Sequence, residues 1–238
     1  MHRVDRAAPE FPQASDVGAW SALTFANAFR GSFEDIQARL AVYLPDVSRA
    51  MRRTRNTAVI DIGCGRGEWL ELLRGNGFNA LGIDESPDAV KTCAERGLDA
   101  RVGDAIESLR AQPDASVAAV TAFHVVEHIP YANVVALIVE AFRVVCPGGI
   151  LIIETPNCEN VVVGANGFWL DPTHIRPYPL PLLEFLVMQA GFVPVELKRL
   201  HPDQALLDDP QMRAVPEPLR AAVAGPQDGG IVAMRKAT

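Results

Sequence analysis

The chain alternates between short apolar runs and segments in which apolar residues recur every three or four positions. We predict a strand for each apolar run, at residues 58–62, 79–83, 99–102, 116–123, 150–154, 192–198 and 231–235. The helical spacing occurs at residues 68–74, 87–96, 132–145 and 180–189. Strands that are apolar on both faces and alternate with helices are typical of a mostly parallel sheet covered on both sides.

The two ends of the chain depart from this alternation. Residues 16–29 have the spacing of a helix, and Ser32 is the predicted N-cap of a second helix over 33–44, which Pro45 would end. Residues 200–229 are rich in Pro, Asp and Gly and predict a long loop with one short helix. Because no apolar crossover helix precedes the last strand, we expect that strand to insert antiparallel.

Composition narrows the possible functions. The 238 residues carry a formal net charge of −7, which argues against nucleic acid or an anionic membrane as a partner. No apolar run approaches the roughly 20 residues of a membrane span, so we expect no membrane insertion and a cytoplasmic protein. The four cysteines are far apart, without a CxxC pair, which predicts free thiols and no structural zinc.

The strongest local pattern is a glycine loop between a predicted strand and a predicted helix. The strand ends at Asp61-Ile62, and Gly63, Gly65 and Gly67 follow at every second position. Glycine lets the backbone turn tightly and approach a ligand closely. In an open α/β sheet, ligands bind at the carboxyl ends of the strands, where this loop would lie. Glu68 stands where a dinucleotide-binding GxGxxG pattern needs its third glycine, so an NAD-dependent dehydrogenase is disfavoured.

Two more acids follow the next two predicted strands. Asp84 comes 23 positions after Asp61, and a carboxylate there can accept hydrogen bonds from both hydroxyls of a ribose. The same carboxylate would repel a 2′-phosphate, which argues against NADP. Asp104 could accept a hydrogen bond from an adenine amine, while the backbone N–H of Ala105 could meet a ring nitrogen.

These segments together resemble the successive motifs of class I S-adenosylmethionine-dependent methyltransferases. The resemblance covers about residues 55–198 and implies S-adenosyl-L-methionine as the cofactor. It implies an α/β fold with a Rossmann-like seven-stranded, mostly parallel sheet, helices on both faces and an antiparallel last strand. We therefore divide the chain into a flexible tail (1–15), an N-terminal helical lid (16–56) and a methyltransferase catalytic domain (57–238). The cofactor-binding residues that the resemblance implies are Arg30, Asp61, Gly63, Gly65, Asp84, Asp104, Ala105 and His124.

Further segments resemble a narrower group, the methyltransferase domain of bacterial O-antigen chain-terminating enzymes. The segments are Phe29-Arg30-Gly31, Phe123 to His128, Glu154-Thr-Pro-Asn157 and Phe168 to His174. That resemblance implies a sugar, a sugar phosphate or another small polar acceptor, such as a glycan terminus in surface polysaccharide biosynthesis. It also implies possible association with polysaccharide-assembly proteins.

The candidate catalytic residues follow the fourth and fifth predicted strands. His128 is suited to act as a general base because imidazole titrates near pH 6.5, although a loop-shaping role is the alternative. Glu127 could orient His128 or simply be exposed. Asp171 and His174 belong to a Pro-rich cluster that could contact the acceptor, and His174 with Arg176 could bind an anionic acceptor. The alternative is that Asp171 and Thr173 only make turn hydrogen bonds. One Asp and one His do not make a metal site, so we expect none.

Two other functions remain open from the sequence. One is a quinone-type or other small-molecule O- or N-methyltransferase, which the Glu127-His128 pair fits equally well. The other is a non-catalytic scaffold that binds the cofactor without turnover.

Overall fold

The computed structural model describes residues 31–237. The predicted helix over 16–29, the tail and Arg30 lie outside the described residues. Within the described part, no helix combines the length and the apolar character that crossing a bilayer requires.

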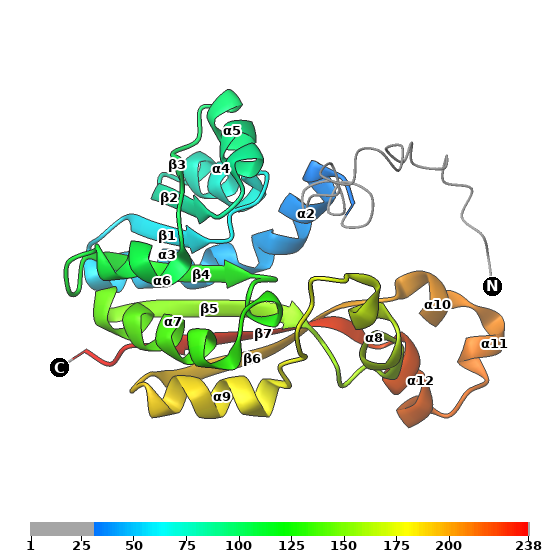
Figure 1. The fold of residues 1–238 in the computed structure, drawn as a ribbon. Coiled ribbons are helices and arrows are strands. Elements are labelled where there is room, and N and C mark those ends of the chain that lie inside the picture. Colours follow the sequence, from blue (N-terminus) through cyan, green and yellow to red (C-terminus); the bar gives the residue numbers. More distant parts are fainter. Residues whose placement is uncertain (1–30, 238) are drawn as a thin grey trace.

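A single seven-stranded sheet forms the centre of the molecule (Figure 1). Its strands, in spatial order, are β3 (Ala100–Val102), β2 (Asn79–Asp84), β1 (Ala58–Ile62), β4 (Val117–Phe123), β5 (Val145–Pro156), β7 (Pro226–Met234) and β6 (Val193–Pro202). Neighbours from β3 to β5 pair in parallel, whereas β7 pairs antiparallel with both β5 and β6. The predicted seven-stranded, mostly parallel fold with an antiparallel last strand is confirmed.

Helices cover both faces of this sheet because its strands are apolar on both sides. One face carries α3 (Leu44–Thr54), α4 (Glu68–Gly75) and α5 (Pro87–Glu95), and the other carries α6 (Ala105–Arg110), α7 (Tyr131–Val144) and α9 (Leu180–Gln189). Successive residues of β1 show the alternation: Val59 packs in the core with Trp69, and Ile60 packs in the core with Leu137.

The segment before the sheet differs from its prediction in one respect. Ser32 caps α2 (Phe33–Leu40) as expected, and its side chain accepts a hydrogen bond from the N–H of Asp35. Pro45 does not end the helical segment. After a short turn, η2 (Ala41–Tyr43), it occupies the first turn of α3, where a missing N–H costs nothing.

Short helices gather beyond the carboxyl ends of the strands (Figure 1). They are η3 (Val126–His128), α8 (Val161–Ala165), η4 (Gly167–Leu170), α10 (Gln204–Asp208), α11 (Pro210–Arg213) and α12 (Glu217–Ala224). The prediction of one short helix in 200–229 was wrong, because three side-chain or proline caps start separate short helices there.

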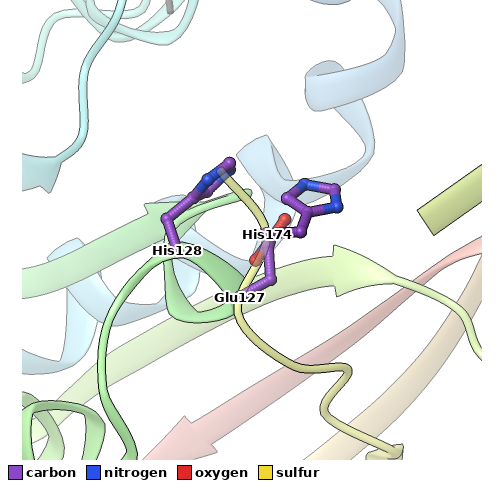
Figure 2. A group of neighbouring side chains, drawn as sticks. All are labelled: Glu127, His128 and His174. Carbon is purple, nitrogen blue, oxygen red and sulfur yellow. The ribbon is translucent and has the colours of Figure 1, made fainter. Parts of the chain in front are cut away.

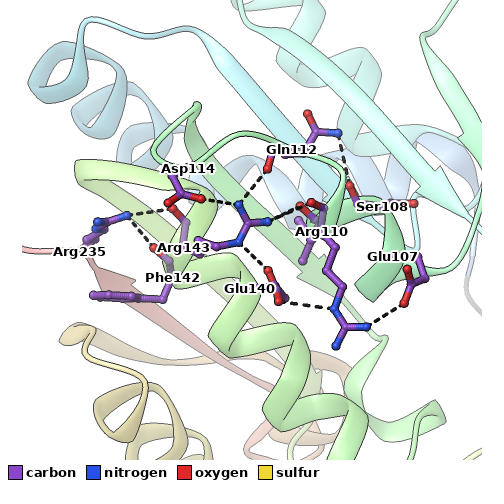
Figure 3. A network of polar contacts seen from close by, with 10 residues as sticks. Glu107, Ser108, Arg110, Gln112, Asp114, Glu140, Phe142, Arg143 and Arg235 are labelled. Carbon is purple, nitrogen blue, oxygen red and sulfur yellow. Dashed lines mark hydrogen bonds and ion pairs between the residues drawn. The ribbon is translucent and has the colours of Figure 1, made fainter.

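Two arginines link the ends of α6, α7 and β7 through hydrogen bonds (Figure 3). Arg143 on α7 donates hydrogen bonds to the carbonyls of Leu109 and Gln112 and to the carboxylate of Asp114. Arg235, just after β7, donates to the carbonyls of residues 142, 143 and 145. This network lies away from the carboxyl ends of the parallel strands, where the predicted site residues lie.

Candidate active site

A cavity of about 980 Å³ opens at the carboxyl ends of the parallel strands. It is bounded by the glycine loop, by α2, by residues 167–174 and by the start of β7. The sequence-predicted site residues that line it are Gly63, Gly65, Asp84, Ala105, His124, His128, Asp171 and His174. The predicted site residues Asp61, Asp104 and Glu127 are not among the described residues that line the cavity.

The glycine loop is shaped by its glycines and held by Asp84. Gly63 has a φ of +67°, and a Cβ there would lie 2.5 Å from a methyl of Val125. Gly65 has a φ of +53° and nothing within 4 Å of a Cβ position, so its backbone borders open space. The two oxygens of Asp84 accept hydrogen bonds from the N–H groups of Gly65 and Ser86, both at 2.9 Å. The carboxylate therefore fixes the loop at the cavity wall.

Asp61 and Asp104 have other partners. Asp61 is buried at the end of β1 and accepts a hydrogen bond from the Thr121 hydroxyl at 2.7 Å. Asp104 is the N-cap of α6, a helix that the sequence analysis missed, and accepts from the N–H of Glu107 at 2.8 Å. Their predicted cofactor contacts stay predictions.

His124, directly after β4, is surrounded by three carboxylates. Its Nδ1 lies 3.3 Å from Glu127, and its Nε2 lies 3.5 Å from Glu154 and 3.5 Å from Asp228. Burial alone lowers the pKa of His124, but the contacts with Glu127 and Glu154 and the charge of Asp228 outweigh it and raise the pKa to about 10. The residue has a φ of +55°, which turns the chain sharply out of the strand.

Each of these carboxylates also has a partner on its other oxygen. Thr155 donates to Glu127 at 3.0 Å, Tyr43 donates to Glu154 at 2.7 Å, and His201 lies 2.7 Å from Asp228. Neither Glu154 nor Asp228 has a role predicted from the sequence. Glu154 belonged to a quoted motif, but Asp228 fell in the predicted loop, so only the pairing of β5 with β7 reveals the cluster.

His128 forms a relay with two residues of the 171–174 segment. Its Nδ1 lies 2.8 Å from the Thr173 hydroxyl, which lies 2.6 Å from the carboxylate of Asp171. A carboxylate can only accept, so the Thr173 proton goes to Asp171, and Thr173 accepts from the Nδ1–H of His128. In neutral His128 the lone pair is then on Nε2. Burial is the main cause that lowers the pKa of His128 from 6.5, so the neutral form prevails at pH 7.

His174 and Glu127 lie beside His128 (Figure 2). The rings of His128 and His174 pack edge to face, with centroids 4.6 Å apart, and Nδ1 of His174 contacts the carbonyl of Phe168. Glu127 is fully buried, so the hypothesis that it is exposed was wrong. Its carboxylate faces His124 and Thr155, and its backbone carbonyl accepts from the N–H of Ile175.

A cation that the sequence analysis overlooked lines the cavity from α2. Arg39 is exposed, borders the cavity and belongs to the last turn of α2. Burial raises the pKa of Asp228, but the hydrogen bond with His201 and the charges of His124 and Arg39 outweigh it and lower the pKa. Arg176, a sequence candidate for an anionic acceptor, instead stacks over the rings of Tyr131 and Tyr178.

Comparison with known proteins places the chain in a family. The model of a family described as "Methyltransferase domain" matches residues 30–197. A crystal structure of a SAM-dependent methyltransferase from Archaeoglobus fulgidus is 30% identical, with a TM-score of 0.76, over 88% of this chain and 97% of that one. The chain belongs to the S-adenosylmethionine-dependent methyltransferase family. This result confirms the predicted family and cofactor, S-adenosylmethionine.

Curated relatives cover less of the chain. A probable S-adenosylmethionine-dependent methyltransferase of Mycolicibacterium smegmatis is 32% identical over 60% of this methyltransferase chain and 55% of its own. A ubiquinone biosynthesis O-methyltransferase of Xanthomonas oryzae is 34% identical over 42% of this chain and 43% of its own. The chain thus spans about half the length of the curated relatives it matches.

The cavity wall fits the family's cofactor. Gly65 offers open space for close backbone approach, and Asp84 at the end of β2 has carboxylate lone pairs beyond the two that its backbone partners use. The cavity volume of about 980 Å³ is at the upper end of small-molecule sites, which leaves room for an acceptor beside the cofactor.

Proposed function

We propose that this protein transfers a methyl group from S-adenosylmethionine to a hydroxyl of a small polar acceptor, a sugar or a sugar phosphate, in surface polysaccharide biosynthesis. The observation that carries the proposal is the relay from His128 through Thr173 to Asp171, on the wall of the cavity that the glycine loop also borders. When bound, the cofactor supplies an electrophilic methyl group. A hydroxyl attacks well only after a base takes its proton, and Nε2 of neutral His128 is that base.

The cofactor would be held by the loops after β1, β2 and β3. Gly63 and Gly65 would border its amino-acid part, Asp84 its ribose, and Ala105 its adenine. Asp84 supports this assignment because both its oxygens already fix backbone N–H groups, so its position is set before the ligand arrives.

The acceptor would occupy the part of the cavity between α2 and residues 167–174. The polar side chains of Arg39, Asp171 and His174 border it, which favours a polar acceptor over a purely apolar one. A guanidinium pairs well with a phosphate, so Arg39 supports a phosphorylated sugar. The resemblance to O-antigen chain-terminating enzymes points to the same class.

A quinone-type acceptor is the second candidate. The similarity to the Xanthomonas ubiquinone biosynthesis O-methyltransferase favours it, as does Leu170, which is 59% exposed and borders the cavity. The same base would serve a phenolic hydroxyl.

An acceptor panel tests the proposal. Purified protein with S-adenosylmethionine is offered sugar phosphates, the matching free sugars and catechol-type phenols, and formation of S-adenosylhomocysteine is followed. We expect turnover with a sugar class and loss of that turnover in His128→Asn without loss of S-adenosylhomocysteine binding. Turnover with phenols alone would favour the second candidate. Tight S-adenosylhomocysteine binding without turnover on any hydroxyl would contradict both and favour a scaffold.

A further inference from the structure

Three side chains from the ends of three adjacent strands converge beneath the cavity. His124 follows β4, Glu154 lies on β5 and Asp228 lies on β7, and all three border the cavity. One ligand atom from each, a ring nitrogen and two carboxylate oxygens, lies within 4.8 Å of the others. Nε2 of His124 is 3.5 Å from an oxygen of Glu154 and 3.5 Å from an oxygen of Asp228.

We propose that His124, Glu154 and Asp228 form a binding site for a divalent metal ion, with Zn²⁺ as the best fit. Tetrahedral zinc with bonds of about 2.1 Å places its ligand atoms about 3.4 Å apart, whereas an octahedral ion with the same bonds places neighbours about 3.0 Å apart. The two observed separations match the tetrahedral value. Three protein ligands leave the fourth position open to the cavity, as in catalytic zinc sites.

Every proposed ligand is also held from behind by a second residue. Glu127 lies 3.3 Å from Nδ1 of His124, Tyr43 donates to the outer oxygen of Glu154, and His201 holds the outer oxygen of Asp228. Metal-binding histidines and carboxylates are typically oriented by such outer partners. Each partner contacts the atom that points away from the proposed metal, so the inner atoms stay available.

The position of Tyr43 depends on a glycine in the opposite strand. A Cβ on Gly230 of β7 would collide with the Tyr43 hydroxyl. Gly230 pairs with Glu154 across the β5–β7 ladder, so its missing side chain makes the space through which Tyr43 reaches the carboxylate. The glycine at position 230 thus leaves room for the hydrogen bond from Tyr43 to Glu154.

Charge also favours a cation here. Glu127, Glu154 and Asp228 are 0%, 2% and 7% exposed, and all three face the single imidazole of His124. Buried carboxylates are costly unless positive charge compensates them. A divalent ion bound to Nε2 of His124, in place of the proton that is released to solvent, would supply more of that charge.

A second group of potential ligands, Glu127, His128 and His174, is less suitable. It offers one carboxylate instead of two, and that carboxylate already faces His124 and Thr155. This group therefore serves as the competing hypothesis in the test.

The test is a metal titration of the full chain, freed of metal with a chelator, and it needs neither cofactor nor acceptor. Zn²⁺ binding is measured by calorimetry, and Co²⁺ binding by its visible spectrum, which separates four-coordinate nitrogen and oxygen ligands from cysteine thiolates. The variants are Asp228→Asn, Glu154→Gln and Tyr43→Phe. The controls are Asp114→Asn, an exposed acid that pairs with Arg143 far from the cluster, and His174→Gln from the competing group.

We expect one Zn²⁺ per chain, about 100-fold weaker binding in Asp228→Asn and Glu154→Gln, and about 10-fold weaker binding in Tyr43→Phe. Both controls should bind as the unmodified chain does. The proposal is overturned if the unmodified chain binds no stoichiometric metal, if both ligand variants bind normally, or if His174→Gln abolishes binding. Circular dichroism of each metal-free variant separates lost ligation from lost folding, and two independent ligand variants guard against one that fails to fold.

Discussion

Replacing Asp84 with asparagine removes the charge that holds the glycine loop. The carboxylate accepts two backbone hydrogen bonds of 2.9 Å, from Gly65 and Ser86. Asparagine keeps one acceptor oxygen, so one of the two N–H groups then faces an amide N–H₂ donor. The shape of the side chain is unchanged, which makes the perturbation specific to charge and hydrogen bonding.

The expected cost follows from the lost contact. A hydrogen bond to a charged group contributes about 1.5–3 kcal/mol, and the same carboxylate is proposed to accept from the ribose. If Asp84→Asn weakens binding by that free energy, the dissociation constant for S-adenosylhomocysteine rises by about 10- to 100-fold.

Isothermal titration with S-adenosylhomocysteine measures this change. Asp88→Asn is the matched control, because Asp88 is an exposed acid on α5 near Asp84 and does not border the cavity. We expect Asp88→Asn to bind normally. A change below about 3-fold in Asp84→Asn, with an unaltered melting temperature, would refute the ribose and loop assignments together.

Three further predictions concern the base, the loop and the core. His128→Asn should lower kcat by about 100-fold. In the unmodified enzyme, kcat/KM should stay level near pH 7 and fall only as the pH drops below 6.5, because burial lowers the pKa of His128. A kcat/KM that already falls as the pH drops toward 7 would contradict the role of His128 as the base. Gly63→Ala should destabilise the fold by about 1–3 kcal/mol in urea unfolding, because its Cβ meets Val125 and its φ of +67° strains a residue with a side chain. Gly77→Ala, with a φ of +80° but open space around it, should cost less, and equal effects would disprove the packing argument. Leu137→Ala should lower the free energy of unfolding by about 2–5 kcal/mol in the same experiment, because Leu137 is completely buried. A loss under about 1 kcal/mol would show that the core closes over the space left by the removed side chain.

Much of the fold could be predicted because its signals are local. The strand at 58–62, the helix at 180–189 and the cap at Ser32 depend on neighbours within a few positions, and the structure places them as expected. The position of Pro45 could not be predicted, because a proline that ends one helix and a proline that begins the next look alike in sequence.

The polar cluster around His124 could not be predicted in the same way. Glu154 and Asp228 are 74 positions apart, and they approach only because β7 inserts antiparallel beside β5. Asp104 has a structural role that the sequence did not predict, because it caps α6, a helix too short for a periodic pattern; its adenine contact stays a prediction. The relay through Thr173 likewise depends on how a loop folds back over η3.

The cavity wall is assembled from two sets of segments that are separate along the chain. The glycine loop, Asp84 and Ala105 belong to residues 63–105, whereas Asp171, His174 and Asp228 come after β5, and Asp228 lies beyond the range that the family model matches. The turn from His124 to His128 lies between the two sets, and α2 and Glu154 of β5 complete the wall. Substitutions in the second set can therefore reshape the proposed acceptor side of the cavity while the glycine loop and Asp84 stay as they are.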